Sequence, residues 1–471
     1  MLKKNEIIRL TVTGISNDGN GVGRYEGQAV FVPFTAVGDI LDVRIVKVMR
    51  SFAYGIIDSI IEPSSDRAEA DCPYFGKCGG CCFRHITYEA ELRAKQSFVE
   101  DALKRIGGLN VSVDAIVPSP DADGYRNKVQ FPVAEIDGRL VPCFYYQRSH
   151  RSIDISDSCL LQPSVMNRIA VAACEVLTGL GESAYDEKTQ TGNIRHLLLR
   201  RSSVDGSILL CVICFDGKVR DEDVFIEKLT SAYPDLRTIV INRNKKPGNG
   251  ILTGDHRIVY GCGHINDVLC GVPAEITYDT FFQINHDSTE NLYNCVREFS
   301  GIGDHQTVID LYCGTGTIGL SCCNKDTKLY GIETTERSIE SAKKAARLMD
   351  YENAEFICGD AGKIRELVDQ GITADVIITD PPRKGCSEEV LEAMDDSGTE
   401  KIVMVSCNPS TLARDLKFLC ERGFVIEKIR PFDLFPRTKH VETVCCLYHQ
   451  KKDFISVPYE PKDAEYLKKT K

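Results

Sequence analysis

Apolar runs and amphipathic helical patterns alternate along the sequence from residue 307 to residue 405, and this alternation strongly limits the possible folds. The runs that predict strands lie at 307–311, 328–332, 356–357, 375–379 and 402–405. Helical patterns separate them, at 338–349, 361–369 and 387–395 among others. Strands joined through helices form parallel, doubly wound sheets. We therefore expect an α/β fold whose ligands lie at the carboxyl ends of the strands.

A glycine-rich turn follows the first of these strands. Gly314, Gly316 and Gly319 have the spacing of a nucleotide-binding loop between a strand and a helix. This spacing alone fits NAD as well as S-adenosylmethionine.

Acidic residues at the ends of the first three strands distinguish the two ligands. These residues are Asp310, Glu333 and Asp360. Asp310 would repel a pyrophosphate but attract an ammonium group, Glu333 is placed for ribose hydroxyls, and Asp360 for the adenine amino group. The pattern favours S-adenosylmethionine, although each residue read singly could be an exposed loop carboxylate.

Cys407 follows the strand 402–405, and Pro409 prevents the ladder from continuing. A thiol at this position can act as a nucleophile if a neighbouring group takes its proton or lowers its pKa. The alternative is that Cys407 is simply one of 21 cysteines, most of them small buried residues.

The N-terminal region predicts a small β-barrel of the oligonucleotide-binding type. Apolar and polar residues alternate at 7–12, 29–32, 40–46 and 53–60, and the glycine-rich segment 14–23 reads as a turn. Beyond a linker near residue 63, a strand-rich region extends from about residue 125 to residue 265.

Three cysteines, Cys72, Cys78 and Cys81, lie within ten residues of one another, with Gly79 and Gly80 between the last two. This spacing predicts a metal site, for which Cys159 is the candidate fourth ligand. Thiolates bind zinc as well as iron–sulfur clusters, and the adjacent Cys82 could replace a neighbour.

The composition indicates a protein of a reducing compartment. The first residues lack the apolar run of a signal peptide, and no apolar stretch reaches the roughly 18 residues that a membrane span needs. We expect a cytoplasmic protein with no membrane contact. The formal net charge of −11 does not exclude a nucleic-acid partner, because phosphate binding needs only a local basic patch.

Several longer motifs together resemble the RNA (uracil-5-)-methyltransferases, most closely the branch that modifies bacterial 23S rRNA. Gly19-Asn20-Gly21-Val22-Gly23-Arg24 resembles a TRAM domain, an RNA-binding barrel. The other motifs are Phe282-Gln283-Ile284-Asn285, Asp310-Leu311-Tyr312-Cys313-Gly314, Asp380-Pro381-Pro382-Arg383-Lys384-Gly385, Ser406-Cys407-Asn408-Pro409 and His440-Val441-Glu442-Thr443-Val444. Amino-group methyltransferases carry an aromatic residue where Arg383 stands, which argues for a different acceptor atom.

The resemblance implies the cofactors, the site residues and the reaction. A 4Fe-4S cluster would be held by Cys72, Cys78, Cys81 and Cys159. Contacts to S-adenosylmethionine would come from Gln283, Asp310, Tyr312, Gly314, Gly316, Thr317, Glu333, Asp360 and Asp380, although some relatives have Asn at the position of Thr317. Cys407 would attack C6 of the uracil, and Glu442 would remove the proton from C5.

The domains expected from these features are a TRAM barrel at 1–62, a central RNA-binding domain with the cluster at 63–264, a Rossmann-like methyltransferase domain at 265–456 and a polar tail at 457–471. The helix at 88–106 is a candidate for packing on the catalytic domain. The implied partner is RNA, either 23S rRNA or tRNA, and no protein partner is implied. Competing interpretations are an NAD-dependent oxidoreductase and a non-catalytic iron–sulfur protein that binds RNA.

Overall fold

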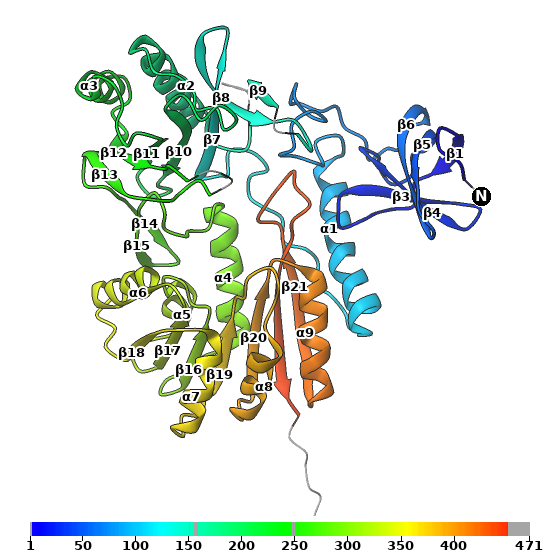
Figure 1. The fold of residues 1–471 in the computed structure, drawn as a ribbon. Helices are drawn as coiled ribbons and strands as arrows, with labels where there is room; N and C mark the ends of the chain where they lie inside the picture. Colours follow the sequence, from blue (N-terminus) through cyan, green and yellow to red (C-terminus); the bar gives the residue numbers. More distant parts are fainter. Residues whose placement is uncertain (1, 150, 155–158, 247, 249, 451–471) are drawn as a thin grey trace, which may run out of the picture.

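The computed structural model describes residues 2–149, 151–154, 159–246, 248 and 250–450; the predicted tail at 457–471 lies outside them. Within this part of the chain, three large sheets and a two-stranded ribbon are present. Figure 1 shows the N-terminal sheet standing apart on one side and the other two sheets stacked one above the other.

The C-terminal sheet confirms the predicted α/β fold. Its strand order is β18–β17–β16–β19–β20–β22–β21, and the first five strands of this order run parallel. The strands are β16 (Thr307–Leu311), β17 (Lys328–Glu333), β18 (Ala354–Cys358), β19 (Val376–Thr379), β20 (Lys401–Ser406), β21 (Phe424–Phe432) and β22 (Glu442–His449). The last strand, β22, inserts between β20 and β21 and is antiparallel to both.

Helices cover both faces of this sheet, as a doubly wound fold requires. The helices are α4 (His286–Ser300), α5 (Thr317–Cys322), α6 (Glu336–Leu348), α7 (Ile364–Asp369), α8 (Glu388–Asp396), α9 (Pro409–Glu421) and the 3₁₀ turn η2 (Ala361–Lys363). Apolar residues of α4, α5 and α6 share one buried cluster with the sheet, and those of α7, α8 and α9 share another. The core of this region therefore has two layers, one on each side of the sheet.

The N-terminal sheet has the order β1–β5–β6–β4–β3–β2 and curves into a half-barrel (Figure 1). Its strands are β1 (Ile7–Thr11), β2 (Gly14–Ile15), β3 (Asn20–Tyr25), β4 (Gln28–Pro33), β5 (Ile40–Val48) and β6 (Phe52–Glu62). The expectation of one continuous turn over residues 14–23 was wrong, because β2 and the start of β3 lie there. Gly21 and Gly23 are needed in β3, since a Cβ would lie 1.8 Å from Thr35 Oγ1 and 2.4 Å from Thr11 O, respectively.

The central sheet runs in the order β13–β12–β11–β10–β7–β8–β9. Its strands are β7 (Lys128–Ile136), β8 (Arg139–Tyr145), β9 (Ser152–Asp154), β10 (Ile194–Arg201), β11 (Ile208–Cys214), β12 (Leu236–Arg243) and β13 (His256–Tyr260). Helices α2 (Ser164–Gly179) and α3 (Glu222–Ala232) pack on it. The ribbon of β14 (Ile265–Leu269) and β15 (Val272–Ile276) joins the core of the C-terminal sheet.

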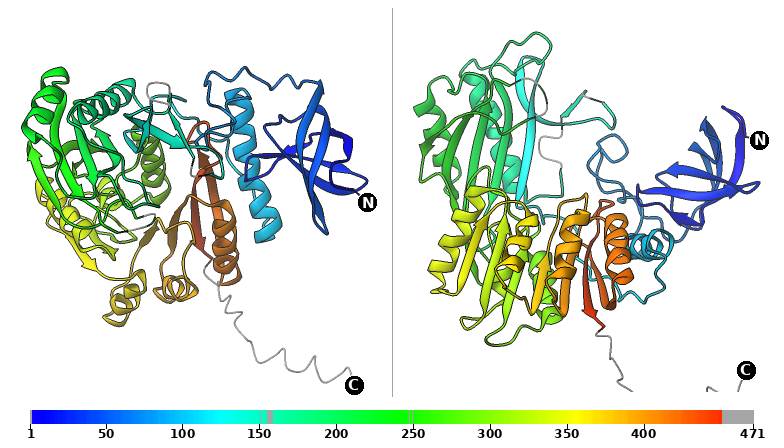
Figure 2. Two further views of the ribbon diagram at one scale, coloured as in Figure 1. Left: turned by 45° about the horizontal axis from the view of Figure 1, so that its top comes forward. Right: turned by 60° about the horizontal axis from the view of Figure 1, so that its bottom comes forward.

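Helix α1 (Tyr88–Ala102) continues into a π-helical turn, η1 (Leu103–Gly107), and Gly108 ends it in the left-handed conformation at φ 66°. Val99, Ala102 and Leu103 share a buried cluster with apolar residues of α9. The helix therefore lies between the half-barrel and the C-terminal sheet, beside α9, as the two views of Figure 2 show.

Among the described residues, no helix is long and apolar enough to cross a membrane.

Candidate active site

The carboxyl ends of the parallel strands open into a cavity of about 640 Å³. This volume lies within the usual range for small-molecule sites, roughly 300–1,000 Å³. Among the residues that line the cavity are eight of the predicted site residues: Gln283, Tyr312, Gly314, Thr317, Glu333, Asp380, Cys407 and Glu442. Residues that are up to 159 positions apart in the sequence, from Gln283 to Glu442, thus meet around one space.

The glycine turn after β16 shapes one wall of this cavity. Tyr312 adopts a left-handed backbone at φ 62°, and Gly314 and Gly316 do so at 55° and 77°. A Cβ on Gly316 would lie 3.0 Å from Ala342 and Phe356, so this glycine allows the turn to pack closely on α6 and β18. Gly316 is not among the lining residues, whereas Gly314 is.

Asp310 lies beneath this turn and is almost completely buried. Its Oδ2 accepts a hydrogen bond from the backbone N–H of Gly319 at 3.0 Å, and its buried Oδ1 has no partner among the described residues. Burial, together with the nearby carboxylates of Asp380 and Glu333, raises the pKa of Asp310 to about 7. An unpartnered buried acceptor of this kind fits a hydrogen-bond donor or a cation.

Asp360 stands apart from the cavity wall. It is exposed at the end of β18, and its Oδ1 accepts the backbone N–H of Gly362 at 2.9 Å, which caps the turn η2. Its predicted contact with an adenine therefore stays a prediction.

Cys407 and Glu442 approach each other because of the antiparallel strand β22. The β20–β22 ladder ends where Ser406 pairs with Thr443. Cys407 follows β20 by one residue and Glu442 is the first residue of β22, so both lie at the same end of this strand pair. Asn408 then caps α9 by accepting the N–H of Ser410 at 3.1 Å, with Pro409 in the first turn.

The pKa values of the thiol and of the two carboxyl groups of this site are all raised, chiefly by burial. Burial raises the pKa of Cys407 to about 11, with further contributions from Glu442 and Asp380. Burial also raises the pKa of Asp380 to about 6 and holds that of Glu442 well above its usual range. The guanidinium of Arg383 opposes these shifts at Cys407 and Glu442. The cavity is therefore short of positive charge and is suited to receive a cation.

Arg383 and His440 form a second polar pair near the site. Arg383 lines the cavity, and its Nη2 lies 3.1 Å from His440 Nδ1. Burial lowers the pKa of His440 to about 4, and the adjacent Arg383 lowers it further. Both residues lie within motifs of the sequence, but His440 and the cavity-lining Phe435 and Phe281 were not predicted as site residues. No charge or spacing signal in the sequence marks those two aromatic residues.

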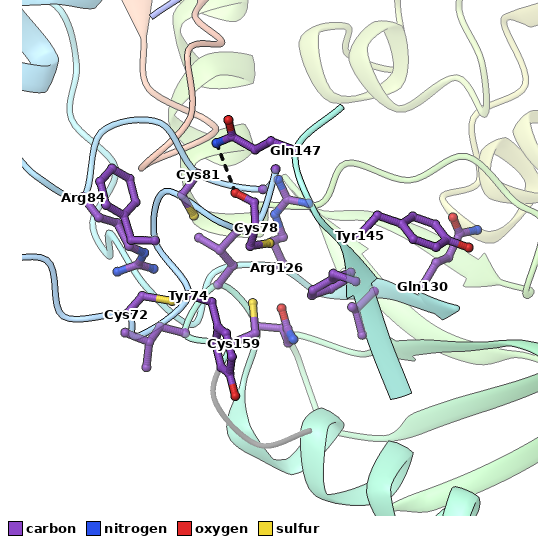
Figure 3. A pocket seen from close by; sticks show the side chains of 18 of the residues that line it. Cys72, Tyr74, Cys78, Cys81, Arg84, Arg126, Gln130, Tyr145, Gln147 and Cys159 are labelled. Atoms are coloured by element: carbon purple, nitrogen blue, oxygen red, sulfur yellow. Dashed lines mark hydrogen bonds between the residues drawn. The ribbon is translucent and has the colours of Figure 1, made fainter. Parts of the chain in front are cut away.

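A second cavity, of about 530 Å³, is lined by all four cysteines of the predicted metal site: Cys72, Cys78, Cys81 and Cys159 (Figure 3). Arg84 and Arg126 lie on the same wall, and Gln147 Nε2 donates to the carbonyl of Cys78 at 3.3 Å. Cys82 does not line this cavity; its Sγ lies 3.3 Å from where a Cβ of Gly19 would be. The structure therefore distinguishes Cys81 from Cys82.

The spacing of these thiols bears on what they would bind. Among the described residues, no three His, Cys, Asp or Glu side chains lie close enough together to hold a single metal ion. A cluster places iron and sulfide atoms between its thiolates and so needs a wider cradle than zinc, whose Zn–S bonds are about 2.3 Å. Burial raises the pKa of Cys78, Cys159 and Cys81, the last to about 11. These thiols would need a positive centre to ionise at neutral pH.

Comparisons with known proteins agree with this geometry. Residues 253–451 match the family model of the tRNA (uracil-5-)-methyltransferases, and residues 2–57 match the TRAM domain. An uncharacterized RNA methyltransferase of Halalkalibacterium halodurans is 37% identical over 448 residues, which cover 95% of this chain and 98% of the relative. One of Clostridium tetani is 38% identical over 454 residues, covering 96% and 98%.

A solved structure resembles almost the whole chain. The tRNA (uracil-54, C5)-methyltransferase of Pyrococcus abyssi, in complex with S-adenosyl-L-homocysteine, superposes with a TM-score of 0.73 at 25% identity. The match covers 93% of this chain and 100% of that protein.

Proposed function

The chain belongs to the RNA (uracil-5-)-methyltransferase family, and on this premise we propose that it methylates a uridine of 23S rRNA at C5 through a covalent bond between Cys407 and C6 of the base. The observation that supports the proposed mechanism is that Cys407, the residue after β20, and Glu442, the first residue of β22, line one cavity at the adjoining ends of these two paired strands. A nucleophile and a base thereby share one space.

The reaction needs both groups, because C5 of uracil is too weak a nucleophile to take a methyl group unaided. Addition of the Cys407 thiolate to C6 makes C5 the carbon end of an enolate, which can then form the new carbon–carbon bond. S-adenosylmethionine supplies the electrophilic methyl group on a positively charged sulfonium. Glu442 then takes the proton from C5, the C5–C6 double bond reforms, and the Cys407 thiolate leaves.

The charges around the cavity favour this sequence. Burial and the neighbouring carboxyls raise the pKa of Cys407 and Glu442, and Arg383 lowers both. A cation in the cavity lowers the pKa of all three acidic groups, and Arg383 acts in the same direction. A base whose pKa has been raised by burial is also the stronger proton acceptor once it is ionised.

We assign the methyl donor to the glycine-turn side of this cavity. Gln283, Tyr312, Gly314, Thr317, Glu333 and Asp380 line it and are the contact residues. Asp310 supports the turn from below, and its unpartnered Oδ1 suits the ammonium group of the donor. Gly316 gives the turn its shape, and Asp360 remains the proposed partner of the adenine.

We assign the second cavity to a 4Fe-4S cluster held by Cys72, Cys78, Cys81 and Cys159. Its support is that four thiols from two distant segments line one cavity. No step of the proposed reaction is a redox step, so the cluster would order the surrounding RNA-binding segments. A target uridine in folded RNA must be flipped out of the base stack, which costs free energy. Binding of the flanking RNA by the protein offsets this cost.

The choice of 23S rRNA rests on the motifs of the sequence together with the half-barrel and the thiol cavity. A tRNA substrate is the second candidate. It is favoured by the similarity to the Pyrococcus abyssi enzyme, a tRNA methyltransferase whose entire length is matched.

The substrate is decided by mapping 5-methyluridine in rRNA and tRNA from cells with and without the gene. The purified chain is then tested on transcripts of both RNAs with S-adenosylmethionine. We expect one or more 23S rRNA sites to lose methylation in the deletion. Loss confined to tRNA would replace the rRNA assignment, and the absence of methyl transfer to any RNA would refute the proposed activity.

A further inference from the structure

The segment 433–441 joins β21 to β22 and ends at the residue before Glu442. It contributes Phe435 to the wall of the catalytic cavity, and it carries His440, whose Nδ1 lies 3.1 Å from Arg383 Nη2. The placement of Glu442 therefore depends on how this segment is held.

A buried cation on α1 holds the start of the segment. Lys95 is completely buried, and its Nζ donates to Glu91 Oε1 and to Asp433 Oδ1, both at 2.7 Å, and to the carbonyl of Phe435 at 3.1 Å. Three donors thus find three acceptors, two of them on the segment. Buried ion pairs contribute little net stability compared with apolar packing, but they fix geometry, because a displaced partner leaves a charge uncompensated.

The same helix holds Arg437, further along the segment, in a strained backbone. Arg437 is a non-glycine residue at φ 67°. Its N–H donates to Glu91 Oε1 at 2.7 Å, and its guanidinium lies over the Tyr88 ring at 5.6 Å. Its carbonyl accepts the N–H of Cys82 at 2.9 Å. Backbone strain persists only where the surroundings impose it, and it concentrates at functional sites.

A third set of hydrogen bonds connects the segment to α1 and to the motif at residues 282–285. The hydroxyl of Tyr88 donates to Asp433 Oδ2 and accepts the N–H of Ser119, both at 2.9 Å. Asn285 Nδ2 donates to the carbonyl of Leu434 at 3.0 Å and to Ser119 Oγ at 3.1 Å. Two buried atoms of the network, Glu91 Oε2 and Arg437 Nε, have no hydrogen-bond partner among the described residues, but bonds from α1 and from residue 285 hold the segment at Asp433, Leu434, Phe435 and Arg437.

We infer that α1 positions the catalytic carboxylate: Lys95, with Glu91 and Tyr88, fixes the segment 433–441 so that Glu442 faces Cys407. The inference rests on the proposed function, because it takes Glu442 as the base that removes the C5 proton. These three are positioning residues, and they lie more than 330 positions before the segment they hold. Since Cys82 also binds Arg437, the cysteine-rich segment is connected to the same support.

The test separates formation of the covalent adduct from its breakdown. With 5-fluorouridine RNA the methylated adduct cannot break down, because C5 carries fluorine in place of the proton, so its formation rate does not depend on the base. With uridine RNA, turnover depends on proton removal by Glu442. The variant is Lys95→Met in the full-length chain, and the control is Lys104→Met, at an exposed lysine on η1.

For Lys95→Met we expect turnover to fall by roughly tenfold to a hundredfold, the size of effect that a misplacement of about 1 Å produces. Adduct formation on 5-fluorouridine RNA should change much less, and adduct should accumulate on uridine RNA. A merely structural role would lower both rates together and would leave no accumulated adduct. Lys104→Met should match the unaltered chain.

Tyr88→Phe guards against a variant that does not fold, because it removes one hydroxyl and leaves the ion cluster intact. In this variant, turnover on uridine RNA should again fall more than adduct formation on 5-fluorouridine RNA, by a smaller factor than in Lys95→Met. The KM for RNA should be unchanged and kcat reduced. Equal losses in formation and turnover in Tyr88→Phe, or no change in either, would overturn the inference while leaving the proposed function in place. Failure of the unaltered chain to form any adduct on 5-fluorouridine RNA would overturn the proposed function and the inference with it.

Discussion

Cys407 and Glu442 line the same cavity at the adjoining ends of β20 and β22, and their removal should have opposite effects on the covalent adduct. Cys407→Ala lacks the sulfur that bonds to C6, so it should form no adduct and no product. Glu442→Gln keeps the nucleophile but loses the base, so it should accumulate adduct while turnover falls roughly 10²–10⁴-fold. The adduct is measured as an RNA-linked band in denaturing gels.

Cys420→Ala serves as the control for this pair, since Cys420 lies on α9, outside the residues that line the cavity. It should behave as the unaltered chain. Turnover by Cys407→Ala would exclude the covalent mechanism, and the absence of adduct in Glu442→Gln would remove the glutamate from its role.

The protonation state of Cys407 in the free enzyme can be tested through the pH dependence of its alkylation. Burial and the neighbouring carboxyls raise its pKa to about 11, so the reactive thiolate is scarce at neutral pH. The rate of alkylation by iodoacetamide at Cys407 should therefore rise with pH, about tenfold per pH unit, until it levels off near the pKa. Mass spectrometry of the Cys407 peptide follows the reaction.

Arg383→Gln tests the sign of the electrostatic argument. Arg383 favours the thiolate, so its removal should raise the pKa of Cys407 and slow alkylation at every pH below the plateau. A rate that is independent of pH above neutrality would show that the thiol is already ionised in the free enzyme.

At the level of secondary-structure elements, the sequence predicts most where one periodicity dominates. The five parallel strands from β16 to β20 follow from short apolar runs between amphipathic helices, and the structure confirms them. β3 was missed because Gly21 and Gly23 look like turn residues, although β3 needs glycine where Thr35 and Thr11 pack against it. The local pattern contains no information about such tertiary contacts.

The candidate site shows the same limit. The strand end and Pro409 place Cys407 where open α/β sheets hold their ligands, but the position alone does not distinguish it from the other 20 cysteines. Glu442 could not be singled out either, because its proximity to Cys407 depends on β22 inserting antiparallel between β20 and β21, which no local pattern specifies. Only the motif around residues 440–444 marked it, through a resemblance to known enzymes.

The half-barrel carries a surface that suits single-stranded RNA. Phe31, Phe52 and Tyr54 form a mutual cluster on β4 and β6, with ring centroids 5.5–5.8 Å apart. Lys47, exposed and opposite Tyr54 in the β5–β6 register, has no ion pair in the described part of the chain. Aromatic faces beside unpaired cations bind bases and phosphates without strict sequence preference.

Phe52→Ala with Tyr54→Ala should therefore weaken RNA binding. Loss of base stacking costs about 1–3 kcal/mol per base, so we expect the Kd for RNA to rise roughly fivefold or more. Binding of S-adenosylmethionine should not change. Tyr448→Ala removes a comparably exposed tyrosine from β22 and should leave both affinities unaltered. An unchanged RNA affinity in the double variant would show that these rings do not contact RNA.

In the whole molecule, the two cavities share a wall. Ile284 lines both, and β7 and the residues before it support that wall: the N–H of Asn127 donates to the carbonyl of Ile284 at 2.9 Å and its Nδ2 to the carbonyl of Gln283 at 2.8 Å. The central sheet therefore holds the backbone of a proposed contact of the methyl donor. The thiol cavity reaches the same backbone at Ile284, the residue next to Gln283.

The position of Cys81 and Cys82 makes the nature of the thiol cavity testable with adjacent residues. Cys81 lines the cavity, whereas Cys82 packs toward Gly19 of the half-barrel. Cys81→Ser should lose iron and acid-labile sulfide together with the visible absorbance of a cluster, and Cys82→Ser should retain them.

The same variant tests the role of the cluster in RNA binding. Without the cluster, Cys159 is no longer crosslinked to residues 72–81. Because such crosslinks stabilise folded segments, the RNA affinity of Cys81→Ser should fall by roughly tenfold or more. The donor site on the C-terminal sheet keeps its own core, so S-adenosylmethionine binding, measured by calorimetry on the same samples, should change little. Zinc without sulfide in the purified chain would contradict the cluster assignment, and full RNA affinity in a folded, iron-free Cys81→Ser chain would contradict its role in ordering the RNA-binding segments.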